Sequence, residues 1–144
     1  MTPSEDDWAS LLAAAQGARE QAYAPYSRYR VGAAVLDEAG RVHAGCNVEN
    51  AAYPEGLCAE AGAIAQLVMA GGRRIVAAVV VGEGAEPITP CGGCRQKLRE
   101  FADGGLPVRS ADVLGWRGEH TLGELLPASF GPAHLTPRGD DYAD

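Results

Sequence analysis

The first 25 residues carry apolar side chains with the period of an α-helix. These side chains recur every three or four positions and belong to Trp8, Leu11, Leu12 and Ala15. Residues at this spacing share one face of a helix. Ser4 and Asp7 have the S-x-x-D spacing of a capping box, and Pro25 would end the helix. The pattern predicts an amphipathic helix from Ser4 to about Ala24.

Apolar and β-branched residues dominate several later segments. Residues 31–36 and 42–47 flank a short polar turn at residues 37–40 and together predict a β-hairpin. Residues 75–81 are apolar almost throughout, so we expect a central strand that is covered on both faces. A further strand is predicted over residues 108–114.

Helical segments alternate with these strands. Residues 58–70 are rich in Ala, Ile, Leu and Met and end at Gly71, and a second helix is predicted over residues 91–102, directly after Pro90. A short helical stretch at residues 122–126 precedes a tail rich in Gly and Pro. Strands that alternate with helices predict an α/β fold in which the helices pack on a mixed sheet.

Length and composition narrow the class of protein. A chain of 144 residues fits a single domain over residues 1–144, with a flexible acidic tail from about residue 136. No tract reaches the ~18 apolar residues that a membrane span needs. The first ten residues are acidic and lack the basic and apolar regions of a secretory signal. We therefore expect a cytoplasmic protein that does not enter a membrane.

The net charge restricts the partners. A formal charge of −7 would repel a phosphate backbone, so a nucleic acid polymer is a poor partner. A nucleoside carries no phosphate and is compatible with this charge. The composition is therefore compatible with a small uncharged ligand.

Three cysteines stand at the starts of two predicted helices. Cys91 and Cys94 form a C-x-x-C motif, which alone is compatible with zinc binding, redox exchange or chance. Cys58 begins the other helix, so the two helix N-termini could bring three thiols to one point. A catalytic zinc takes three protein ligands and leaves the fourth position for water. The partial positive charge of helix N-termini would offset the thiolates.

Glu60 follows Cys58 by two residues and could reach water at such a metal without binding the metal itself. A carboxylate in that place can accept a proton and return it to a substrate. Acidic residues are also common in first helical turns, so this role depends on the neighbouring cysteines. We assign the remaining cysteine, Cys46, to the core. Three isolated histidines are not expected to be ligands: they are His43, His120 and His134.

Several motifs occur in the order found in one enzyme family. They are Ala24-Pro25-Tyr26-Ser27, Val31-Gly32-Ala33-Ala34, Gly45-Cys46-Asn47-Val48-Glu49-Asn50-Ala51, Cys58-Ala59-Glu60 and Pro90-Cys91-Gly92-Gly93-Cys94-Arg95-Gln96. Through them the chain resembles the cytidine deaminases of the small homotetrameric zinc type, over roughly residues 22–131. The resemblance implies a three-layer α/β/α sandwich around a mixed sheet of roughly five strands.

The resemblance also implies a reaction. Cytidine or deoxycytidine would be hydrolysed to uridine or deoxyuridine with release of ammonia, as in pyrimidine salvage. One zinc ion per subunit would be held by Cys58, Cys91 and Cys94, and water at the zinc would attack carbon 4 of the pyrimidine. Glu60 would protonate ring nitrogen 3 and later the leaving amine.

Four residues match family positions that contact the nucleoside. Asn47 and Glu49 match those that hydrogen-bond the ribose. Tyr29 stands where the family usually has a phenylalanine near base and sugar, so an aromatic face is kept. The backbone near Ala59 would hold the base. These residues would form the substrate site.

Two aromatic residues match positions that reach a neighbouring subunit. Tyr53 and Phe130 correspond to side chains that, in the tetramers, enter an adjacent active site. The sequence alone favours ordinary packing aromatics at both positions. The resemblance implies a homotetramer whose active sites are completed across subunits.

One position departs from the family. Three-cysteine deaminases commonly carry an arginine after the glutamate, which hydrogen-bonds the ligand thiolates, whereas this chain has Ala61. Another group must then offset the thiolate charge. The nearest candidate in the sequence is Arg95, and the helix termini are the alternative.

Other interpretations stay open at this point. A related deaminase could act on another cytosine-containing compound, such as the antibiotic blasticidin S. A non-catalytic module stabilised by zinc would need a fourth protein ligand, Cys46 or a histidine. A redox C-x-x-C protein would need neither Glu60 nor the ribose-binding pair.

Overall fold

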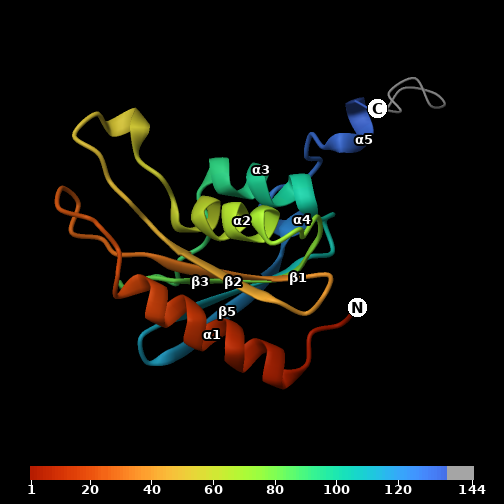
Figure 1. Ribbon diagram of the computed structural model, residues 1–144, viewed down its shortest axis with the longest axis horizontal. Coiled ribbons are helices and arrows are strands. Elements are labelled where there is room, and N and C mark those ends of the chain that lie inside the picture. Colours follow the sequence, from red (N-terminus) through yellow and green to blue (C-terminus); the bar gives the residue numbers. More distant parts are fainter. Residues whose placement is uncertain (136–144) are drawn as a thin grey trace.

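A five-stranded sheet lies between two layers of helices in the computed structural model, which describes residues 1–135. Helix α1 covers one face, and α2 and α3 cover the other (Figure 1). The predicted α/β/α sandwich with a five-stranded mixed sheet is confirmed. The elements are α1 (Glu5–Arg19), β1 (Gly32–Asp37), β2 (Val42–Cys46), the 3-10 turn η1 (Tyr53–Glu55), α2 (Ala59–Met69), β3 (Ile75–Val81), α3 (Gly92–Phe101), β4 (Pro107–Asp112), β5 (Gly115–Thr121), α4 (Leu122–Leu125) and α5 (Pro132–Leu135).

The sheet has the strand order β2-β1-β3-β4-β5. Strand β1 pairs antiparallel with β2 and β3, β3 pairs parallel with β4, and β4 pairs antiparallel with β5. Strand β3 is therefore central, and all of its residues except Val76 are buried. This confirms the prediction that its nearly continuous apolar sequence is covered on both faces.

Each face of the sheet has its own apolar core. On the α1 side, the buried core includes Trp8, Leu11, Ala15, Leu36 and Val79. On the side of α2 and α3, it includes Ile64, Leu67, Leu98, Val108 and Leu122. The amphipathic α1 predicted from the sequence thus packs through the expected face, and its capping box at Ser4 and Asp7 is present.

Helix α1 ends earlier than predicted. The helix stops at Arg19, not near Ala24. The reason is long-range pairing: the Tyr23 N–H donates to the Asn47 carbonyl (3.0 Å), and the Glu49 N–H donates to the Tyr23 carbonyl (2.8 Å). A residue held in such a bridge cannot also continue a helix, so the prediction was wrong over the last turn.

Strand β5 was missed by the sequence pattern. The predicted strand over 108–114 ends at Asp112, whose side chain accepts the N–H groups of Leu114 (2.8 Å) and Gly115 (3.1 Å). Gly115 has a φ of 141°, which a glycine adopts without strain. The chain therefore turns back into β5, an edge strand whose polar and half-exposed residues give little periodic signal.

Helix α2 lies unusually close to strand β2. A Cβ added to Gly45 would lie 2.4 Å from both the Ala59 carbonyl oxygen and the Ala63 nitrogen. A Cβ added to Gly62 would lie 3.4 Å from the Gly45 Cα. Backbone thus meets backbone where helix and strand cross, which only glycine permits.

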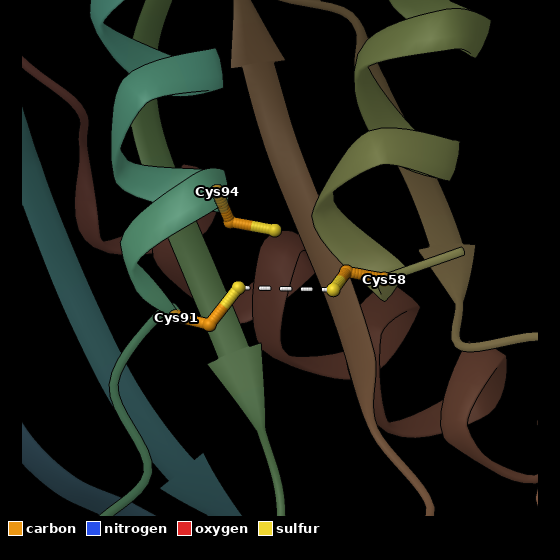
Figure 2. A group of neighbouring side chains, drawn as sticks. All are labelled: Cys58, Cys91 and Cys94. Carbon is orange, nitrogen blue, oxygen red and sulfur yellow. Dashed lines mark hydrogen bonds between the residues drawn. The ribbon is translucent and has the colours of Figure 1, made fainter. Parts of the chain in front are cut away.

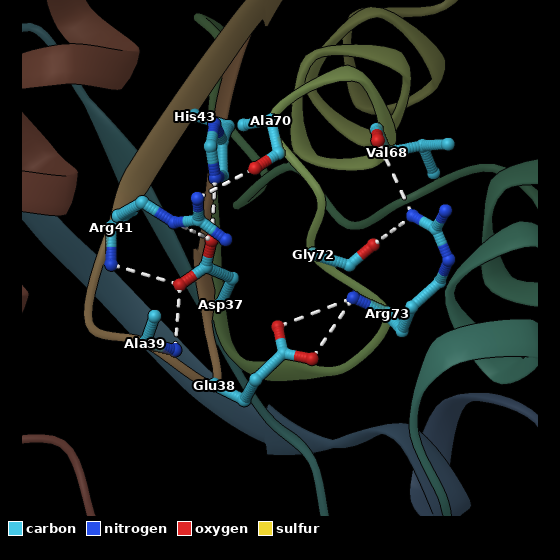
Figure 3. Close-up of polar contacts among 9 residues, drawn as sticks. All are labelled: Asp37, Glu38, Ala39, Arg41, His43, Val68, Ala70, Gly72 and Arg73. Atoms are coloured by element: carbon cyan, nitrogen blue, oxygen red, sulfur yellow. Dashed lines mark hydrogen bonds and ion pairs between the residues drawn. The ribbon is translucent and has the colours of Figure 1, made fainter.

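The C-terminal end of α2 is tied to the β1–β2 turn by polar contacts (Figure 3). Arg41 donates from Nη1 to the Ala70 carbonyl (2.6 Å) and from Nε to Asp37 Oδ2 (2.7 Å). Asp37 is fully buried and also bonds His43 Nε2 (2.8 Å). Arg73 donates from Nη1 to the Gly72 carbonyl (2.6 Å).

The predicted flexible tail from about residue 136 lies outside the described residues. Over residues 1–135, the helices are too short or too polar to cross a membrane.

Candidate metal centre and substrate pocket

Three cysteine side chains converge between the first turns of α2 and α3 (Figure 2). Cys58 is the N-cap of α2, Cys91 is the N-cap of α3, and Cys94 lies in the first turn of α3. The three sulfurs lie within 4.8 Å of one another. Two helix N-termini therefore face one point, as the sequence predicted.

The spacing of the sulfurs fits a zinc ion. Two thiolates on a tetrahedral zinc, each about 2.3 Å from the metal, are about 3.8 Å apart. The sulfurs of Cys58 and Cys91 are 3.7 Å apart. The donor set of three thiols also suits zinc. Cys58, Cys91 and Cys94 are thus the residues that could hold the metal.

Within residues 1–135, this sulfur group contains no fourth Cys, His, Asp or Glu. Cys46 lies outside it and is only half-buried, so its assignment to the core holds in part. Each histidine has another contact: His43 bonds Asp37, His120 lies near Glu124, and His134 bonds Gly131. The open fourth position argues against a closed structural zinc site.

The pKa values of the three thiols are shifted in different directions by their surroundings. Burial raises the pKa of Cys94 and of Cys58. Burial also opposes the Cys91 thiolate, but the backbone N–H of Cys94 and the neighbouring thiols outweigh it and lower the pKa of Cys91. A dication held between the three would favour the thiolate form of all of them.

Glu60 lies beside the sulfurs and is almost completely buried, with 6% of its surface exposed. Burial raises the pKa of Glu60, and hydrogen bonds from its own backbone and from Cys94, with the charge of Lys97, only partly oppose this. A raised pKa brings a carboxyl group closer to the range in which it both accepts and donates a proton. Glu60 can therefore serve in proton transfer.

Arg95 does not take the place of the arginine that the family usually has beside the thiolates. Its guanidinium donates to the carbonyls of Pro90 (2.7 Å) and Leu125 (2.7 Å) and to Thr89 Oγ1 (3.0 Å). It thus braces the loop that leads into Cys91. The two helix starts supply positive potential at the sulfurs, and the charge of Lys97 acts on the neighbouring Glu60.

A cavity of about 480 Å³ opens beside the metal centre. This volume suits a small organic ligand. Of the residues predicted from the sequence, those that line it are Tyr29, Asn47, Glu49, Tyr53, Cys58, Ala59, Glu60 and Cys91. Two of the three cysteines, Glu60 and the proposed substrate residues other than Phe130 thus line one cavity, whereas Cys94 is buried and does not line it.

Asn47 and Glu49 are engaged by the loop between α1 and β1. Glu49 accepts the N–H groups of Tyr26 (2.9 Å) and Ser27 (3.1 Å) as well as the Ser27 hydroxyl. Asn47 accepts the Val31 N–H (2.9 Å) and donates to the Tyr29 carbonyl (2.8 Å). The hydrogen bonds from Ser27 and Tyr26 outweigh desolvation and lower the pKa of Glu49.

The two predicted inter-subunit aromatics lie in different places. Tyr53 lines the cavity, with 75% of its surface exposed, and packs edge-on against Tyr26 at 5.9 Å. Phe130 is 56% exposed and stacks on His134, and it is not among the residues that line this cavity. The following helix, α5, lies at the far end of the molecule from the loops around the cavity (Figure 1).

Several residues of this region were not singled out from the sequence, among them Ile88, Thr89 and Ser27. Ile88 and Thr89 line the cavity from the loop before Cys91, and Ser27 contacts Glu49. Ile88 and Thr89 directly precede the P-C-x-x-C segment, and that position was the available signal. Ser27 lies in the quoted segment Ala24–Ser27, but its partner is 22 residues away.

Known proteins share the sequence and the fold of this chain. The family described as "Cytidine and deoxycytidylate deaminase zinc-binding region" matches residues 5–108. A cytidine deaminase from Sporosarcina psychrophila is 43% identical over 130 residues, which cover 90% of this chain and 96% of that protein. One from Mycobacterium tuberculosis is 43% identical over 129 residues, covering 87% and 90%.

Solved structures agree with the sequence relatives. The crystal structure of cytidine deaminase from Burkholderia pseudomallei has a TM-score of 0.79 and 44% identity, and the match covers 85% of this chain and 98% of that one. The structure from Mycobacterium tuberculosis has a TM-score of 0.74 and 42% identity, with 87% and 98% covered. The resemblance to the cytidine deaminases that the motifs predicted is confirmed, and with its three-cysteine zinc-binding region the chain belongs to the cytidine and deoxycytidylate deaminase family.

Proposed function

We propose that the chain catalyses the hydrolytic deamination of cytidine and deoxycytidine to uridine and deoxyuridine, with release of ammonia. The observation that carries this proposal is the shared cavity. The sulfur group and the buried Glu60 lie at one side of it, and Asn47 and Glu49 also line it. A pyrimidine at the metal centre could thus have its sugar beside an amide and a carboxylate.

The proton transfers fall to Glu60. Zinc held by Cys58, Cys91 and Cys94 would act as a Lewis acid that lowers the pKa of water. The Glu60 carboxylate accepts a proton from the attacking water and gives it to ring nitrogen 3 as the C4–O bond forms. The remaining water proton then reaches the amino group through Glu60, and the C4–N bond breaks to release ammonia.

Asn47 and Glu49 retain hydrogen-bonding capacity for a sugar. A carboxylate offers about four acceptor positions, and Glu49 uses three of them in the contacts described. The Asn47 amide has two N–H donors and uses one, toward Tyr29. Each side chain can thus meet one ribose hydroxyl, while the Tyr29 ring and the backbone of Ala59 border the base.

The charges around the cavity favour a nucleoside over a nucleotide. The family includes deaminases of both kinds of substrate. Within the described chain, the residues that line the cavity include no Lys or Arg, whereas Glu49 is an anion with a lowered pKa. A phosphate group would meet no opposite charge there and would be repelled by Glu49.

We also infer a homotetramer whose active sites are shared between subunits. Phe130 is exposed and does not line the cavity of its own chain, so its proposed substrate contact requires a second copy. Co-expression of Glu60→Ala and Phe130→Ala chains tests this sharing. Hybrid assemblies should regain activity, because a site with Glu60 from one chain and Phe130 from the other is complete. Activity no higher than that of the single variants would contradict shared sites.

The free thiols support a reducing compartment. The chain has four free cysteines, and two of those at the metal centre are exposed. Exposed thiols persist where glutathione and thioredoxin keep them reduced. We therefore infer a cytoplasmic location.

An assay of substrate range tests the proposed reaction. Cytidine, deoxycytidine, cytosine, deoxycytidylate and blasticidin S are followed spectroscopically with the wild type and Glu60→Ala, and zinc is measured in both proteins. We expect turnover of the two nucleosides, retention of zinc in the variant and a rate loss of about 10³-fold or more. A fully active variant would refute the role of Glu60, and turnover of blasticidin S alone would assign another substrate.

A further inference from the structure

We propose that Ser27 is a positioning residue that couples Glu49 to the backbone of Tyr29, so that one hydroxyl sets the place of both substrate contacts. The inference rests on the proposed function for its kinetic test. Ser27 itself lines a second cavity of about 370 Å³, which shares Glu49, Tyr53 and Gly56 with the first. It thus lies behind Glu49 as seen from the substrate pocket.

The Ser27 hydroxyl makes two contacts of opposite direction. It accepts the Tyr29 N–H (3.0 Å) and lies in hydrogen-bond contact with Glu49 Oε2. A carboxylate only accepts, so the single hydroxyl proton must point to Glu49. The result is a directed chain from the Tyr29 N–H through Ser27 to Glu49. Removal of the hydroxyl breaks both contacts together.

The backbone beside Ser27 needs such support. Arg28 has a φ of 62°, in the left-handed region that side chains other than glycine rarely adopt. The segment is fixed on one side by Glu49, which accepts the Tyr26 and Ser27 N–H groups, and on the other by Ser27 Oγ at Tyr29. Surrounding contacts of this kind are what hold a strained residue in place.

The position of the Tyr29 ring depends on this backbone. The Tyr29 hydroxyl lies 2.8 Å from the point where a Cβ on Gly82 would be, and the Ile88 side chain lies 2.7 Å from the same point. The hydroxyl end of the ring therefore lies close to Gly82 and Ile88 at the cavity wall, while 41% of the Tyr29 surface is exposed. A small shift of the Tyr29 backbone would move the ring against these neighbours and out of its place beside the substrate.

Substitutions at Ser27 can distinguish a positioning role of its hydroxyl from a general contribution to stability. Ser27→Ala should raise the KM for cytidine about tenfold, the cost of one lost charged hydrogen bond, with kcat changed less than about threefold. Ser27→Thr keeps the hydroxyl and should restore the KM. Ser10→Ala removes an exposed serine hydroxyl from α1 and serves as the matched control. The effects of Ser27→Ala and Glu49→Gln on KM should combine to less than their product.

Amide hydrogen exchange of the free protein provides a readout without substrate. Ser27→Ala should accelerate exchange at Tyr29 by about tenfold or more, and Ser27→Thr should not. Unchanged exchange overturns the proposal whether or not cytidine is a substrate. Faster exchange with an unchanged KM in an active enzyme also overturns it, because Ser27 would then only stabilise the loop. If the wild type leaves cytidine intact, the proposed function fails, while faster exchange with Ser27→Ala still supports the link between Ser27 and Tyr29.

Discussion

The two ends of α2 are held in opposite ways. At the N-terminal end, the N-cap Cys58 makes no side-chain cap hydrogen bond, and the first turn borders the cavity. At the C-terminal end, Arg41 and Arg73 satisfy the carbonyls of Ala70, Gly72 and Val68. At the N-terminal end the N-cap side chain thus takes up none of the first-turn N–H groups, while at the C-terminal end protein side chains occupy the carbonyl acceptors. The metal centre thus lies at the N-terminal end of α2, and the contacts that anchor the helix lie at its C-terminal end.

The largest effect is expected at the N-terminal end. Cys58→Ala removes one of three sulfurs and should lower both zinc content and deaminase activity to below about 1% of the wild type, because first ligands matter more than the outer contacts that already cost 10–100-fold. Zinc is measured by atomic absorption next to the activity assay. Cys46→Ala is the control, since Cys46 lies outside the sulfur group. Full zinc content in Cys58→Ala would contradict the assignment.

Just beyond the metal centre, where the first turns of α2 cross β2, a single added methyl group should lower the free energy of unfolding. The added Cβ of Gly45→Ala would meet only backbone atoms of α2, which cannot rotate away. We expect a loss of about 3 kcal/mol in the free energy of unfolding, at the upper end for overpacking. Gly17→Ala is the matched control, because a Cβ there meets nothing within 4 Å. Equal stability of the two variants would show that α2 can lift from β2.

At the C-terminal end, Asp37→Asn should lower the free energy of unfolding by less than Gly45→Ala does. The size of this loss should depend on pH. Burial opposes ionisation of Asp37, but hydrogen bonds from His43, Arg41 and Ala39 outweigh it and lower its pKa from 3.8 to about 2. A shift of this size corresponds to about 2 kcal/mol of the free energy of unfolding. Chemical denaturation of both proteins across pH measures the difference.

The direction of this pH dependence follows from the lowered pKa. The stabilisation by Asp37 is fully present above pH 3.8 and is lost as the pH falls through about 2. The difference in the free energy of unfolding between the wild type and Asp37→Asn should therefore be largest above about pH 4 and should vanish toward pH 2. A gap that widens on acidification would contradict this account. Zinc binding near neutral pH should change little.

The smallest effect is expected for Arg73→Ala. Arg73 is exposed, and its side chain meets the Gly72 and Val68 carbonyls in competition with water. We expect a loss below about 1 kcal/mol, measured by thermal unfolding, and no change in KM. The neighbouring exposed Arg74→Ala is the control. A loss as large as that of Asp37→Asn would mean that Arg73 is the main anchor of this end.

The sequence predicted the metal end of the site well because its signals are local. Cys58, Cys91 and Cys94 stand at helix starts that are marked by Pro90 and by the composition of the following turns. The positions of the strands β1 to β3 also follow from short apolar runs. Residue type and spacing within one turn marked each helix start, whereas the approach of Cys58 to Cys91 joins residues 33 positions apart.

The sugar side could not be derived in the same way. The sequence predicted that Asn47 and Glu49 contact ribose, but their use by the loop from Tyr26 to Val31 depends on partners 16–23 residues away. The early end of α1 has the same origin in the pairing of Tyr23. Strand β5 was missed because an edge strand needs no apolar periodicity. Long-range pairing, which no local window contains, explains these differences.

The glycine crossing between β2 and α2 has a consequence for redesign. Because the backbones touch at Gly45 and Gly62, the depth of α2 is set by the crossing and not by the volume of its core side chains. The interior around Ile64 and Leu67 can then accept other apolar shapes of similar volume while the sulfur of Cys58 keeps its place. Apolar residues of this core can therefore be changed without moving the metal ligands.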